Sequence, residues 1–140
     1  RELILRTLEN VEGMSLDALQ AGVGADWPFE TFPEYLDAVE RRGTSINVGV
    51  LVGQTPVRMY VMGEEATERE ATADEIAHMK AIVAEALEAG AVGFATSKAP
   101  TPVGYAVRPV PRPTASPHEL QAPSARLRYT APGLMLVVQI

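Results

Sequence analysis

The feature that most constrains the fold is a short apolar run between Ser45 and Arg58 that ends in a glycine. The aliphatic residues of this run, most of them β-branched, are Ile46, Val48, Val50, Leu51 and Val52. Such a run is typical of a strand covered on both faces. Gly53 then permits a turn, Thr55 can cap a helix, and Pro56 suits the first position of that helix. We therefore expect a buried strand followed at once by a polar turn and a helix.

Helical patterns alternate with strand-like runs along the chain. Residues 3–11 and 32–39 carry apolar side chains at helical spacing, and a single turn is expected at 15–20. The clearest helix begins at a capping box, 72–75, and ends at Gly90.

Two further strands are predicted, at 91–96 and 134–140, separated by a proline-rich loop at 99–114. A helix after Ser116 is expected to be short because Pro123 interrupts it. Alternating helices and strands indicate right-handed βαβ units on a parallel sheet, hence an α/β fold. Three strands cannot close an eight-stranded barrel, which needs about 250 residues. Because both ends of the chain fall inside regular elements, it is expected to be a piece of a larger protein.

Composition excludes several classes of function. The 140 residues carry a formal net charge of −6, which disfavours nucleic acid and anionic membranes as partners. The chain has no cysteine, which excludes disulfides and thiolate metal sites within it. No apolar run approaches the length of a membrane span. We expect a cytoplasmic protein whose exposed sheet edges favour association.

An acidic connection at 64–75 holds six carboxylates but lacks the glycine-centred alternation of a calcium loop, so a solvated surface loop is expected. Both histidines, His78 and His118, lack a partner at metal-site spacing. No metal ligand is therefore predicted within this chain.

Polar residues that follow parallel strands lie on the face where α/β proteins bind ligands. Gln54 either shapes such a site or bonds a neighbouring loop. Arg58 either binds a substrate carboxylate or forms a structural ion pair with an acidic neighbour. Ser97 is placed to bind substrate, although no histidine base accompanies it, and Tyr105 can line a pocket from the proline-rich loop.

Thr96 and Lys98 flank Ser97 at the end of the second strand, with solvated lysine as the default interpretation of Lys98. Trp27 and Phe29 are interpreted as core anchors rather than as a binding platform.

An ordered string of short motifs resembles the N-acyl-D-amino-acid deacylase (D-aminoacylase) branch of the amidohydrolase superfamily. The motifs span 9–113 and occupy residues 9–14, 26–38, 47–49, 51–53, 55–58, 71–79 and 90–94. The resemblance implies a (β/α)8 barrel, of which residues 1–140 would be a single segment, incomplete at both ends. It implies zinc-assisted hydrolysis of the amide bond of an N-acyl-D-amino acid, a small-molecule substrate. It also implies metal ligands in a His-x-His pair and later histidines, none of which is present in this chain.

Two departures from the family matter. Gln54 and Pro102 stand where the family commonly has histidine. Glutamine can donate and accept hydrogen bonds but cannot replace an imidazole base. Two alternatives to a fragment of an active, metal-dependent hydrolase therefore remain: a catalytically inactive relative, and a small α/β binding or assembly module. As a fragment without its metal ligands, this chain is expected to be inactive alone.

Overall fold

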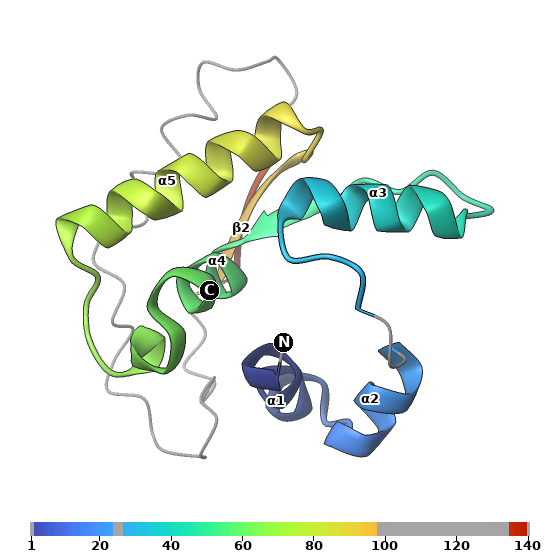
Figure 1. Ribbon diagram of the computed structural model, residues 1–140, viewed down its shortest axis with the longest axis horizontal. Coiled ribbons are helices and arrows are strands. Elements are labelled where there is room, and N and C mark those ends of the chain that lie inside the picture. Colours follow the sequence, from blue (N-terminus) through green and yellow to red (C-terminus); the bar gives the residue numbers. More distant parts are fainter. Residues whose placement is uncertain (1, 24–26, 98–134, 140) are drawn as a thin grey trace.

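Three short parallel strands and the helices between them make up the structure, a computed structural model that describes residues 2–23, 27–97 and 135–139 (Figure 1). The elements in chain order are α1 (Glu2–Glu12), α2 (Leu16–Val23), α3 (Phe32–Arg42), β1 (Leu51–Gly53), α4 (Gln54–Met62), the 3₁₀ helix η1 (Gly63–Thr67), α5 (Ala73–Glu88), β2 (Gly93–Ser97) and β3 (Met135–Gln139). The predicted α/β class is confirmed.

The sheet has the order β1-β2-β3, and both pairings are parallel. Leu51 pairs with Gly93 and Gly53 with Ala95, so β1 and β2 end almost level. Parallel pairing requires a crossover between the strands, and α4, η1 and α5 supply it. The described strands form an open sheet, so the eight-stranded barrel stays a prediction.

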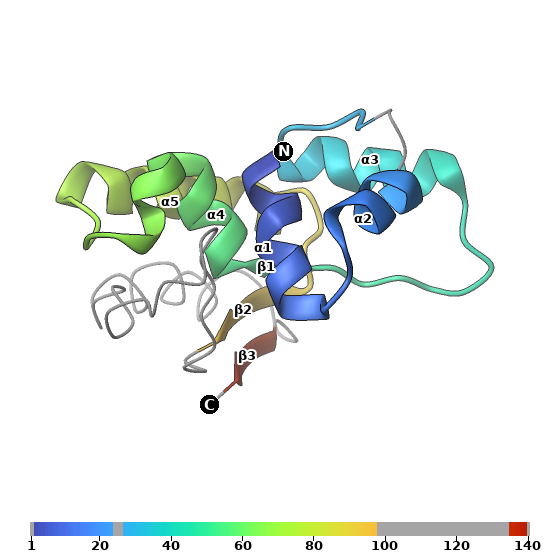
Figure 2. The same ribbon diagram turned by 90° about the horizontal axis from the view of Figure 1, so that it is seen from below.

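The core lies between the sheet and the crossover helices, which gather on one side of the strands (Figure 2). Val52 and Phe94 point into it from β1 and β2 and are 2% and 1% exposed. Helices α4 and α5 complete the core with Val57, Met59, Met62, Met79, Val83 and Ala86. Because Val83 and Ala86 are fully buried, α5 packs closely against its neighbours.

Local capping signals fix the two best-defined helices. Thr31 and Glu34 form a capping box at α3, and Thr72 and Glu75 form one at α5, as predicted for the latter. Backbone N–H groups of Thr31 and Glu30 donate to the Glu34 carboxylate, and they lower its pKa. Gly43 ends α3 with a φ of 73°, a conformation that favours glycine.

The prediction that the run from Ile46 to Val52 forms one strand covered on both faces is wrong in its extent. β1 holds only three residues, and Ile46 and Val48, which precede it, are 74% and 52% exposed. The backbone N–H of Val92 still bonds the carbonyl of Val50, so pairing with β2 reaches one residue further back. Among the described strands, β1 is at the edge of the sheet, and none covers its outer side.

Three local expectations also need correction. Helix α4 begins at Gln54, so Gly53 rather than Thr55 is its N-cap, and no side chain caps it. A side chain at Gly53 would lie 3.1 Å from Cδ of Pro56, which explains the glycine by close approach rather than by backbone angle. The expected single turn at 15–20 is an eight-residue helix, and the acidic connection contains η1 instead of being an open loop.

Truncating the buried Met79 should destabilise the protein strongly. Met79 is 2% exposed, so Met79→Ala removes packed atoms and leaves a cavity, and we expect a loss of about 2–5 kcal/mol in unfolding free energy. Urea denaturation followed by circular dichroism measures it. Met14→Ala is the matched control, since Met14 is 47% exposed and should change stability little; equal losses for the two variants would contradict this core.

Candidate functional site

The candidate site lies where β1 and β2 end, and Gln54 and Thr96 meet there. Gln54 directly follows Gly53, the last residue of β1. Gly53 pairs with Ala95 of β2, and Thr96 is the next residue of that strand. The Thr96 hydroxyl donates a hydrogen bond to Oε1 of Gln54. The two residues are 42 positions apart in the sequence, and the parallel register alone brings them together.

The other end of the Gln54 amide is unsatisfied. Its Nε2 is buried and has no hydrogen-bond partner among the described residues, although the residue as a whole is half-buried. A buried donor without an acceptor costs about 1–3 kcal/mol. The site therefore contains a positioned amide N–H group to which a ligand oxygen can bind.

Arg58 lies inside the fold rather than at the strand ends. It is 6% exposed, its Nε donates to the carbonyl of Ala66 at 2.6 Å, and its Nη2 donates to the carbonyl of Arg69. These contacts tie α4 to η1 and to the segment that leads into α5. They are structural contacts, and binding of a substrate carboxylate by Arg58 stays a prediction.

Arg69 links the crossover to the start of α5. Its Nη1 and Nη2 bond the Glu75 carboxylate at 2.8 and 2.7 Å, and its Nε bonds Glu65 at 2.6 Å. The Arg69 side chain lowers the pKa of Glu75 to about 2, assisted by the backbone N–H of Thr72. Hydrogen bonds from Arg69 to Glu75 and Glu65 raise the pKa of Arg69 in turn.

The structure describes the remaining predicted site residues only in part. Ser97 ends β2, where its backbone pairs with Gln139 of β3. Tyr105 lies outside the described residues, as do Lys98, Pro102 and His118. The structure therefore brings Gln54 together with Thr96, and it buries the side chain of Arg58.

Sequence reasoning named Thr96 only as a residue that closes the second strand, and it missed the contact with Gln54. A signal was available in the sequence. Gln54 follows one predicted strand and Thr96 ends the next, and the carboxyl ends of neighbouring parallel strands meet at one edge of the sheet.

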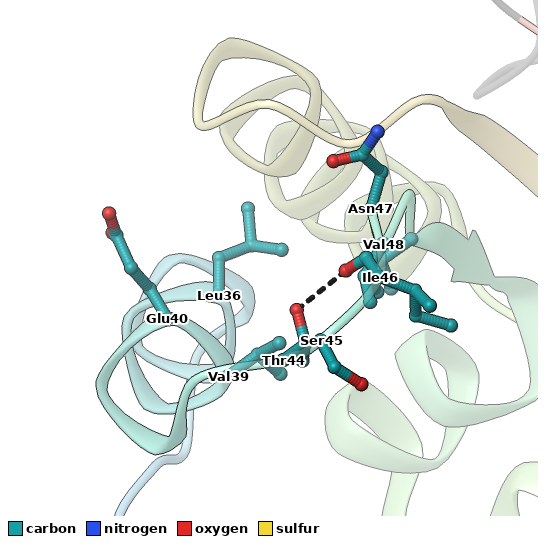
Figure 3. A pocket seen from close by; sticks show the side chains of 9 residues that line it. Leu36, Val39, Glu40, Thr44, Ser45, Ile46, Asn47 and Val48 are labelled. Carbon is teal, nitrogen blue, oxygen red and sulfur yellow. Dashed lines mark hydrogen bonds between the residues drawn. The ribbon is translucent and has the colours of Figure 1, made fainter.

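An open groove of about 600 Å³ lies elsewhere, between α3 and the chain that enters β1 (Figure 3). Leu36, Val39 and Glu40 line it from α3, and residues 44–48 and Val50 line the other side. The Thr44 hydroxyl donates to the carbonyl of Ile46 at 2.7 Å and shapes that wall. Glu40 is the single ionisable side chain of the lining, so the groove lacks a paired acid and base.

Within the described ranges, no three histidine, cysteine, aspartate or glutamate side chains gather as a metal site would require. His78 is exposed on α5. The described residues therefore do not fit the zinc site that the family resemblance implies. None of the described helices is long and apolar enough to cross a membrane.

Comparison with characterised proteins confirms the resemblance to the deacylases over part of the chain. The chain is 37% identical over 73 residues to a D-aminoacylase, 44% over 68 residues to an N-acyl-D-aspartate deacylase, and 40% over 78 residues to an N-acyl-D-glutamate deacylase, all from Alcaligenes xylosoxydans xylosoxydans. These matches cover 49–56% of the chain, less than the three quarters that the motifs indicate.

The chain spans only 13–16% of the length of these relatives. No family model matches it, and no solved structure matches it. The similarity is therefore to one segment of the deacylases.

Replacing Arg58 should destabilise the fold, because its side chain bonds two backbone carbonyls. Arg58→Lys keeps the charge but cannot reproduce both bonds to the carbonyls of Ala66 and Arg69, so we expect a loss of about 1–3 kcal/mol in unfolding free energy. Urea denaturation measures it against Arg41→Lys, an exposed control at the end of α3. Unchanged stability would contradict a structural role for these two bonds.

Stability should fall in acid as Glu75 is protonated. The pKa of Glu75 is about 2 in the folded chain and the ordinary 4.5 in the unfolded chain. The Arg69 contact therefore stabilises the fold fully above pH 4.5, and this stabilisation is lost as the pH falls toward 2.

Glu75→Gln keeps an acceptor for the capping box but removes the charge, and it should flatten this part of the pH profile. Thermal unfolding between pH 2 and 6 measures the difference, and Glu88→Gln, at the exposed end of α5, is the control. A Glu75→Gln profile as steep as that of the wild type would contradict the assignment.

Proposed function

We propose that this chain is a segment of a D-aminoacylase-like hydrolase that cleaves the non-peptide amide bond of N-acyl-D-amino acids. The observation that carries the proposal is the identity of 37–44% to three deacylases named for such substrates. The similarity to N-acyl-D-aspartate and N-acyl-D-glutamate deacylases favours substrates of the same kind, small amides that carry a free carboxylate.

In this proposal, residues 1–140 form part of the wall of an eight-stranded barrel, and the strand ends at Gln54 and Thr96 face the substrate. This is the face on which barrel enzymes bind substrates. Ser97 and Tyr105 are further proposed contacts from the same region of the sequence, and Arg58 is retained on the basis of sequence alone. The family's zinc would be bound by side chains elsewhere in the polypeptide, since the described residues offer no ligand set. We place the protein in the cytoplasm.

A second candidate is a relative that binds such amides without cleaving them, or that serves as an assembly module. Gln54 favours it, because an amide occupies a position where the family commonly has an imidazole, and an amide cannot act as a base at neutral pH. β1 lies at the edge of the described sheet, which is compatible with an assembly role.

Activity of the natural polypeptide that carries this sequence tests the first candidate. Its intact mass is expected far above 15.0 kDa. Incubation with N-acetyl-D-glutamate should release free D-glutamate, with loss of activity after chelation and recovery on adding zinc, whereas the isolated 140-residue chain should release none.

Three results would change the proposal. Zinc-dependent hydrolysis by the isolated chain would contradict a metal site elsewhere, and a natural mass near 15.0 kDa would contradict a segment. A long natural polypeptide that binds N-acetyl-D-glutamate but never hydrolyses it would establish the second candidate.

A further inference from the structure

The Gln54 amide is oriented by one partner and left open at its other end. Thr96 Oγ1 donates to Oε1, so that oxygen is engaged, and no acceptor from the described part of the chain bonds Nε2. Sequence neighbours could not make this contact, since Gln54 is the first residue of α4 and Thr96 lies in β2. An amide with one end bonded and one end unpaired has a defined direction in which it can donate.

We propose that Thr96 is a positioning residue, and that it fixes the Gln54 carboxamide so that Nε2 donates to an oxygen of the bound substrate. This inference rests on the proposed function, because the oxygen belongs to the carboxylate or to the acyl carbonyl of an N-acyl-D-amino acid. Both are acceptors, and an amide nitrogen is a donor with two N–H groups.

Gln54 and Thr96 are both half-buried, so the pair reaches the surface although Nε2 itself is covered. The terminal torsion of glutamine has a broad energy well, and the Thr96 hydroxyl can rotate with it. Nε2 can therefore turn toward a bound ligand while the Thr96 bond to Oε1 continues to orient the amide.

The chemistry also explains how glutamine serves at a position where an imidazole is common among the deacylases. A neutral imidazole and a carboxamide share the ability to donate one N–H to an oxygen, although the carboxamide cannot take up a proton at neutral pH. The position then contributes binding and orientation of the substrate rather than acid–base chemistry.

Steady-state kinetics of the natural polypeptide on N-acetyl-D-glutamate test the inference. Thr96→Val keeps the β-branched shape but removes the hydroxyl, and we expect kcat/KM to fall about five- to tenfold. Gln54→Glu replaces the donor by a carboxylate that accepts only, and kcat/KM should fall by more than about tenfold. Thr96→Ser, which restores the hydroxyl, should be close to wild type.

The way in which kcat/KM falls identifies the substrate oxygen. Contact with the carboxylate is the same in the ground state and the transition state, so its loss raises KM and leaves kcat unchanged. Contact with the acyl carbonyl strengthens as negative charge develops on that oxygen, so its loss lowers kcat. Either pattern supports the inference.

Two controls match the chemistry of the substitutions at exposed positions. Thr44→Val removes a hydroxyl that bonds the carbonyl of Ile46, and Gln20→Glu adds a carboxylate on α2. Both should leave kcat/KM within about twofold of wild type. Suppose that the wild-type polypeptide is active and that Thr96→Val or Gln54→Glu also keeps kcat/KM within about twofold of wild type. The inference is then wrong, and the proposed function stands. Activity of Gln54→Glu above wild type would likewise overturn a donor role.

An inactive wild-type polypeptide would instead remove the proposed function, and binding then decides the inference. Isothermal titration with N-acetyl-D-glutamate should show binding that Gln54→Glu and Thr96→Val weaken about five- to tenfold or more. Absence of binding by the wild type, or equal binding by the variants, would overturn it.

Discussion

Parallel pairing of β1 with β2 over the core formed by α4 and α5 is the constraint on which the rest of the structure depends. Three paired positions set the level at which both strands end, and Phe94 and Val52 anchor those strands to the helices. A shift of one residue in this register would turn the strand side chains to the opposite face. The same register sets Thr96 beside Gln54, so the candidate site is a consequence of how the core packs.

Local features of the fold could be predicted from the sequence because their causes are local. The capping box of Thr72 and Glu75 involves residues three apart, and the helix of α5 follows from it together with its apolar spacing. The parallel arrangement could also be inferred, since helices alternate with strand-like runs. The limits of β1 could not be inferred from the sequence. Exposure of Ile46 and Val48 depends on which elements pack beside them, and an apolar run alone does not identify those elements.

The candidate site was predictable in position but not in detail. The rule that ligands bind beyond the ends of parallel strands pointed to Gln54, and the structure adds the partner that orients its amide. For Arg58 the sequence left two interpretations open, a substrate carboxylate and a structural ion pair. Its described bonds go to the backbone carbonyls of Ala66 and Arg69 inside the crossover. Whether such an arginine bonds a ligand or the backbone depends on how the following segment folds. Sequence spacing alone does not predict that conformation.

The buried Arg58 also has a consequence for how the molecule opens. One side chain on α4 joins carbonyls that lie eight and eleven residues further along, and Arg69 continues the connection to Glu75 in the first turn of α5. Since these contacts must break together, α4, η1 and the start of α5 should form one cooperative unit of local unfolding. Their amide hydrogens would then exchange with solvent at a common rate, rather than fraying separately from each helix end.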